Sequence, residues 1–252
     1  MRFSLNPIVN AVACVAFVGS LAAISAAAMA ADSPAMSAAA RPAADLARDS
    51  SRKPAEMLTF AQVQPGQTVV DFIPGSGDFT RVFSTAVGPG GGVYAVTPQL
   101  VIDKHNNAPK PSPVSAEPGR ANVHEAIANQ STLNVPVKVD MVWTAQNYHD
   151  IHIWAGPAGA AQLNKSVFEA LKPGGVYVVV DHAGAPGLDE AGMASLHRID
   201  EDLVKKEVLA AGFTLDGESS LLHNPADAHT ANVFDPAIRG KTDQFMLRFR
   251  KP

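Results

Sequence analysis

Cysteine is nearly absent from this chain of 252 residues, and its single copy, Cys14, lies within the first thirty. This segment combines Arg2, an uncharged run rich in alanine and valine over 7–28, and a small-x-small sequence at 28–30. The order is typical of a cleaved secretory signal peptide, so we expect residues 1–30 to be removed and the mature protein to be periplasmic or secreted. A mature chain without cysteine excludes disulfides, thiolate nucleophiles and cysteine-ligated metals.

Long apolar stretches are otherwise missing. The run at 7–28 is long enough to be an uncleaved membrane anchor, but its alanine content and the cleavage sequence favour removal. We therefore expect no stable membrane insertion after signal cleavage.

Runs of basic residues are also missing. The chain has 20 Lys and Arg against 24 Asp and Glu, a formal net charge of −4. Loss of residues 1–30 removes only Arg2, so the balance moves from −4 to −5. A mildly acidic chain without a basic run is a poor candidate for nucleic-acid binding, and a small-molecule partner is expected instead. No oligomeric state is predicted.

The composition divides the rest of the chain in two. Residues 31–47 are rich in Ala, Ser and Pro, and we interpret them as a disordered leader. Residues 48–252 are numerous enough for one domain with a sizeable core.

Apolar, β-branched stretches alternate with helical patterns along residues 48–252. The predicted strands are 67–72, 93–96, 122–127, 137–144, 176–180, 213–218 and 244–250. Predicted helices begin at Pro54, cover roughly 163–171, and follow a capping Asp200. This alternation predicts an α/β fold with a doubly wound, mostly parallel, seven-stranded sheet. Only a long loop joins the last two strands, so the last should be antiparallel, and its one-sided apolar pattern predicts an edge position.

One strand–turn–helix unit is central to the functional prediction. The strand at 67–72 ends with the acidic Asp71, the turn contains Gly75 and Gly77, and an apolar helical face begins at Phe79. Such a unit presents free backbone N–H groups to a ligand, and ligands of these sheets bind beyond the carboxyl ends of the strands. By itself the turn is equally compatible with a purely conformational role.

Several stretches around this unit resemble the class I S-adenosylmethionine-dependent methyltransferases. They are the D-x-x-x-G-x-G of 71–77, VYAV at 93–96, VDMVW at 139–143 and LKPGGVYVVVDH at 171–182. More narrowly, SRKPAEML and HRIDEDLVKKEVLAAGF are similar to an exported bacterial group described as predicted methyltransferases. The resemblance covers residues 48–252. It implies a Rossmann-like methyltransferase fold and methyl transfer from S-adenosylmethionine to a small molecule.

The resemblance also implies which residues hold the cofactor. They are Asp71, Gly75, Ser76, Gly77, Thr97 and Asn129. Two positions depart from the family pattern, because Ile73 replaces the first glycine and Thr97 replaces the acidic residue that grips the ribose. Loss of that carboxylate removes a charge-assisted contact worth about 1.5–3 kcal/mol.

Acid–base residues follow the fourth and fifth predicted strands. Methyl transfer to oxygen or nitrogen requires loss of a proton, and histidine titrates near neutral pH. The resemblance therefore implies His149, Asp181 and Tyr148 as catalytic residues, with His149 or Asp181 as the base and His182 on the same rim. A loop histidine bonded only to backbone is the alternative for His149. Together with His152 these histidines and Asp181 could form a divalent metal site, since His and Asp suit Zn²⁺ or Fe²⁺. No two of them show a metal-ligand spacing on one helix, so no metal is predicted.

Two other functions remain open from the sequence. A non-catalytic relative would bind a small ligand in the periplasm with an altered turn. A nicotinamide dehydrogenase would need a third glycine and an acid after the second strand, where Arg81 and Thr97 stand, so it ranks last. The long segment 221–242 has no clear secondary structure and is predicted to be a lid over the site.

Overall fold

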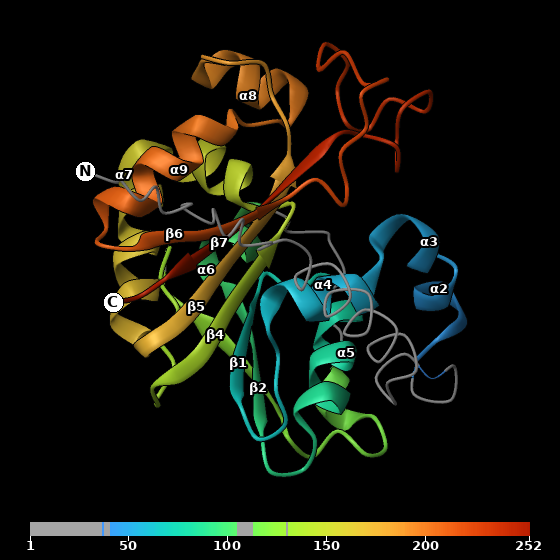
Figure 1. The fold of residues 1–252 in the computed structure, drawn as a ribbon, viewed down its shortest axis with the longest axis vertical. Helices are drawn as coiled ribbons and strands as arrows, with labels where there is room; N and C mark the ends of the chain where they lie inside the picture. Colours follow the sequence, from blue (N-terminus) through green and yellow to red (C-terminus); the bar gives the residue numbers. More distant parts are fainter. Residues whose placement is uncertain (1–36, 38–40, 105–112, 130) are drawn as a thin grey trace, which may run out of the picture.

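The computed structural model describes residues 37, 41–104, 113–129 and 131–252 (Figure 1). The predicted signal peptide lies outside the described residues. In the part that is described, no helix is both long and apolar enough to cross a membrane.

Seven strands form one sheet in the order β3-β2-β1-β4-β5-β7-β6. They are β1 (Thr68–Phe72), β2 (Gly92–Pro98), β3 (Val123–Ala128), β4 (Val139–Ala145), β5 (Leu171–His182), β6 (Thr214–Ser219) and β7 (Gln244–Arg250). Strands β1 to β5 are parallel to one another. Strand β7 is antiparallel to both β5 and β6. The predicted doubly wound, mostly parallel sheet with an antiparallel last strand is confirmed.

Helices cover both faces of this sheet (Figure 1). They are α2 (Ala43–Leu46), α3 (Asp49–Arg52), α4 (Pro54–Ala61), α5 (Asp78–Val87), α6 (Gln99–Lys104), α7 (Tyr148–Ala170), α8 (Glu190–Leu196) and α9 (Glu201–Ala210), with a 3-10 turn at Val114–Ala116. Apolar side chains of α7, α8 and α9 form one core with alternate strand residues such as Val70 and Val142. Those of α4 and α5 form a second core with Val69 and Trp143. The central strands are mostly apolar because both faces are buried.

The position of the last strand differs from the prediction. β7 lies between β5 and β6, and β6 forms the edge of the sheet. The edge position was predicted because polar residues alternate along β7 and were expected to face solvent. Arg248 instead donates to Asp216 Oδ2 at 2.8 Å and to the Phe60 carbonyl at 2.6 Å. A one-sided pattern can therefore belong to an interior strand when its charges are paired.

Ordered structure begins before the predicted boundary at residue 48. Helix α2 falls within the segment interpreted as a leader, and the Arg41 side chain is fully buried. Arg41 pairs with Asp49 at 2.6 Å and with Asp78 at 2.9 Å, while Asp45 pairs with Arg81 at 3.0 Å. Composition did not reveal this, since the partners lie up to 37 positions away.

Helix α7 is longer than the sequence predicted. The expected helix around 163–171 is only its second part, because Gly156 breaks α7 with a φ of 65° and Pro157 follows it. Tyr148 and His149, expected in a loop after the fourth strand, instead form the first turn. The Gly–Pro pair hid this turn, since proline and glycine normally end a helical pattern.

Candidate functional site

The glycine turn between β1 and α5 has a left-handed backbone. Gly75 and Gly77 have φ values of 57° and 79°, and Ile73 has a φ of 60°. A β-branched residue in this region is an outlier and costs about 1–3 kcal/mol. Ile73 therefore holds the conformation that a glycine at the first motif position would adopt freely. The strained conformation is held from the start of α7, because the N-cap residue Asn147 donates from Nδ2 to the Ile73 carbonyl at 3.2 Å.

The two glycines of this turn differ in their surroundings. A Cβ added at Gly75 would meet no atom within 4 Å, whereas one at Gly77 would lie 2.4 Å from Val114 Cγ2. Gly77 is thus required by packing, and Gly75 faces open space. Ser76 beside them is exposed, and its hydroxyl accepts from Arg48 Nη2 at 3.2 Å.

Asp71, at the end of β1, is buried under this turn. Its carboxyl accepts a hydrogen bond of 2.6 Å from the Thr80 hydroxyl of α5. Burial raises the pKa of Asp71 to about 7, which the Thr80 bond only partly offsets. Asp71 therefore links strand, turn and helix as a carboxyl that is only about half ionised at neutral pH.

Two predicted cofactor residues end the neighbouring strands. Thr97 on β2 is 5% exposed, and its hydroxyl is buried without a hydrogen-bond partner among the described residues. Asn129 follows β3 and is exposed. A buried hydroxyl without a partner is uncommon in native structures, so Thr97 is the polar group at this edge that a ligand would satisfy.

A cavity of about 340 Å³ lies beyond the carboxyl ends of β4 and β5. Gln146 and His182 line it from these strands, Phe79 lines it from α5, and Arg48 and Arg52 line it from the N-terminal helices. The cavity thus adjoins the first turn of the helix that follows the glycine turn, as expected for ligand binding in a parallel sheet.

The segment 221–242 forms another wall of the cavity through Val233, Phe234 and Arg239, in keeping with the predicted lid position. Arg198 anchors it. The Arg198 side chain is fully buried and pairs with Asp227 at 2.9 Å. Its partner lies 29 residues away in this segment, so no local sequence pattern indicates the pair.

His149 and Asp181 form a buried pair. His149 Nδ1 donates to Asp181 Oδ1 at 2.7 Å, and the His149 backbone N–H donates to Oδ2 at 2.8 Å. Burial opposes the charge on both groups, but their mutual attraction is stronger, so the pKa of His149 is raised and that of Asp181 is lowered. Neither residue lines the cavity.

Tyr148 points to the other side of α7. Its hydroxyl donates to Glu207 Oε2 at 2.8 Å and accepts from Asn164 Nδ2 at 2.7 Å. The side chain is fully buried, and burial raises the pKa of the phenol well above its ordinary value. The predicted catalytic tyrosine therefore lies between α7 and α9, apart from the cavity.

His182 is the histidine that lines the cavity among its described residues. Its Nδ1 lies 2.8 Å from the Thr242 hydroxyl. Burial lowers the pKa of His182 to about 4, so the imidazole is neutral near neutral pH. The sequence placed His182 on this rim but did not select it as the base.

No family model matches the chain, and no curated protein matches it in sequence. Solved structures do match. A Galdieria sulphuraria protein described as a candidate sarcosine dimethylglycine methyltransferase has a TM-score of 0.56 at 15% identity, with 80% of this chain and 84% of that chain covered. The glycopeptide N-methyltransferase MtfA with sinefungin has a TM-score of 0.51 at 15% identity, covering 80% and 86%. The chain has the class I methyltransferase fold.

A third solved structure of similar fold is described as a cyclase and not as a methyltransferase. The [4+2]-cyclase SpnF has a TM-score of 0.54 at 16% identity, with 80% of each chain covered. Likeness at this identity shows the fold alone, and function has to be argued from the site.

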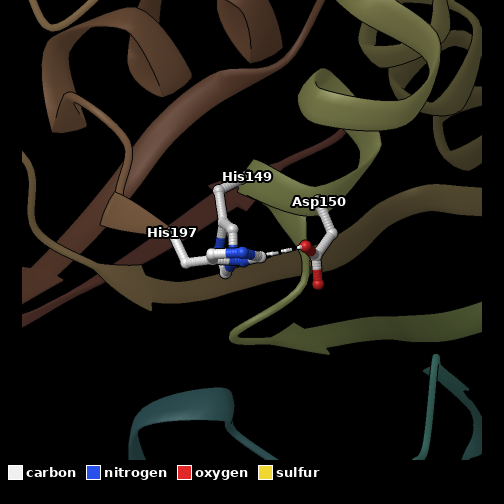
Figure 2. Close-up of side chains that lie close together, drawn as sticks. All are labelled: His149, Asp150 and His197. Atoms are coloured by element: carbon white, nitrogen blue, oxygen red, sulfur yellow. Dashed lines mark ion pairs between the residues drawn. The ribbon is translucent and has the colours of Figure 1, made fainter. Parts of the chain in front are cut away.

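Within this methyltransferase fold, the sequence missed one group of side chains. Figure 2 shows His149, Asp150 and His197 directed at one another. Asp150 Oδ1 lies 3.5 Å from both His149 Nε2 and His197 Nδ1. His197 follows α8, far from the other two in sequence, so spacing could not reveal it. His152, which the sequence grouped with His149, instead pairs with Glu207 at 2.9 Å.

Proposed function

We propose that the protein transfers a methyl group from S-adenosylmethionine to a small molecule. The observation that carries the proposal is the cavity beyond β4 and β5, which adjoins the helix after the glycine turn. In a sheet of this strand order, that arrangement lets a ligand on the turn meet a second ligand in the cavity. MtfA, of the same fold, was solved with S-adenosylmethionine as well as with sinefungin.

The described residues fit the cofactor. The open backbone at Gly75 and Ser76 would receive its methionine part, while Gly77 and Asp71 hold the turn in place. The Thr97 hydroxyl, which has no partner among the described residues, would bond to the ribose in place of the family's carboxylate. Asn129 would face the adenine. Bound there, the cofactor supplies an electrophilic methyl group.

Alignment of the two ligands would account for most of the catalysis. The cavity contacts favour His182 as the group that accepts the acceptor's proton, in place of His149, Asp181 or Tyr148. Asp181 then acts as a positioning residue, because its Oδ1 accepts from the His182 backbone N–H at 2.7 Å and from His149 Nδ1.

Export is a further part of the proposal. The signal sequence at 1–30 and the similarity to an exported bacterial group both support a periplasmic or secreted enzyme. S-Adenosylmethionine is made in the cytoplasm, so the cofactor would have to be supplied outside it.

The second candidate is a non-catalytic protein that binds a small ligand. Thr97 in place of a carboxylate favours it, since affinity for the ribose is reduced.

Calorimetry with S-adenosylmethionine and S-adenosylhomocysteine tests the proposal directly. The protein is expressed as the full chain and purified in its exported form. We expect binding of both compounds, and transfer of a labelled methyl group to at least one member of a panel of small alcohols, amines and acids. Binding without any transfer would favour the second candidate. Absence of binding would reject the proposed cofactor.

A further inference from the structure

Three potential metal ligands meet where α7 packs beside the end of α8 (Figure 2). The donor atoms are His149 Nε2, Asp150 Oδ1 and His197 Nδ1, and all lie within 4.8 Å of one another. They come from two segments distant in sequence, since His149 and Asp150 begin α7 and His197 ends α8. The fold therefore brings together a set that no local motif contains.

The spacing suits a metal better than hydrogen bonding. Both histidine-to-Asp150 distances are 3.5 Å, which is longer than an ordinary N–H···O bond. Ligands bound tetrahedrally at about 2.0–2.2 Å lie about 3.3–3.5 Å from one another. His197 Nδ1 is buried and makes no hydrogen bond among the described residues.

Asp181 orients the first ligand from behind. His149 Nδ1 donates to Asp181 Oδ1 at 2.7 Å, so in the neutral imidazole Nε2 carries the lone pair and faces Asp150. Asp181 is itself fixed by the backbone N–H groups of His149 and His182. A carboxylate behind a ligating histidine is the usual supporting arrangement of metal sites.

We propose that His149, Asp150 and His197 bind a divalent transition-metal ion such as Zn²⁺. Two imidazoles and one carboxylate suit Zn²⁺ or Fe²⁺, and three protein ligands leave a coordination position open. The side chains of Asp150 and His197 are 17% and 27% exposed, while the donor atoms Asp150 Oδ1 and His197 Nδ1 are buried, so the site lies just below the surface.

The site borders the cavity. The His197 ring contacts Phe234 with a centroid distance of 4.9 Å, and the His149 ring contacts His182 at 5.9 Å. Phe234 and His182 both line the cavity. A further step, which rests on the proposed methyl transfer, is that the ion binds an oxygen or nitrogen donor of the acceptor and lowers its pKa.

Cobalt titration tests the site without cofactor or acceptor. The exported protein, without a polyhistidine tag, is titrated with Co²⁺ and followed by visible absorption and calorimetry. We expect one Co²⁺ ion to bind per chain, with the strong visible absorption of four-coordinate Co²⁺. His197→Ala and Asp150→Asn should each weaken binding at least tenfold, and Asp181→Asn by about 10–100-fold. His124, an exposed histidine on β3, provides the matched control, and His124→Ala should bind Co²⁺ like the parent.

Thermal unfolding of each variant separates loss of ligands from loss of fold. His197→Ala is the main variant because His149 is nearly buried and its removal disturbs the core. Absence of Co²⁺ binding by the parent overturns the metal site, and so does equal binding by His197→Ala and His124→Ala. Because S-adenosylhomocysteine binding is measured separately, failure of the cofactor proposal leaves this result intact.

Discussion

The two halves of the carboxyl edge of the sheet are built differently. Beyond β1 and β2, the turn depends on left-handed backbone at Ile73 and Gly75, with one carboxyl, Asp71, that burial keeps only about half ionised at neutral pH. Beyond β4 and β5, imidazoles and carboxylates crowd together, with His149 only 2.7 Å from Asp181. The first half can recognise a ligand by shape, and the second can move protons or hold an ion. The difference agrees with our proposal that the first half binds the cofactor and the second carries the reaction.

The largest expected effect comes from His182→Ala in the β4–β5 half. Removal of the base should lower methyl transfer by about 10²–10³-fold, the lower part of the range for general bases, because a pKa of about 4 makes the His182 imidazole a weak base. S-Adenosylhomocysteine affinity should stay within a few-fold of the parent, because the β1–β2 half is untouched. Single-turnover transfer and calorimetry measure the two quantities. His223→Ala, a more exposed histidine of the 221–242 segment, is the control, and equal rates for both variants would remove His182 from the mechanism.

The converse change is Gly75→Val in the β1–β2 half. Valine at a φ of 57° is strained and fills the space where the ligand would approach, so S-adenosylhomocysteine binding should fall by about a hundredfold. Gly66→Val is a matched control at the opposite end of β1, since Gly66 also has a positive φ and no atom within 4 Å of an added Cβ. Equal loss in both variants would mean that strain, rather than contact with the ligand, is responsible.

The smallest effect on function is expected from Asp71→Asn, which changes stability instead. The folded-state pKa of about 7 lies above the ordinary value of 3.8. The stability that protonated Asp71 contributes to the parent is therefore full below about pH 4 and is lost as pH rises through 7. Asparagine keeps an acceptor for Thr80 without ionising, so the variant should be more stable by up to about 4 kcal/mol above pH 7.

Urea unfolding at about pH 8 and about pH 4 measures this difference. Most of the gain should disappear at the lower pH, because Asp71 is then protonated in the folded protein and only about half ionised in the unfolded chain. A constant difference at the two pH values would show that folding does not raise the pKa of Asp71.

Local sequence patterns were enough to predict the strand–turn–helix unit of the β1–β2 half, because its residues Asp71, Gly75 and Gly77 are close together in the chain. The β4–β5 half depends on contacts between distant segments, which local patterns do not contain. His197 and Arg198 take their roles from partners in other elements, which no single-sequence pattern contains. Tyr148 was misjudged for the same reason, since its partner Glu207 lies 59 residues away.

The place of β7 in the sheet has a consequence for folding. β6 pairs only with β7 in the described sheet, and β7 follows β6 along the chain. Until β7 is in place, β6 has no backbone partner in this sheet and β5 keeps one side unpaired. Unpaired strand edges of this kind can pair with another chain, so the insertion of β7 removes two sites of association at once.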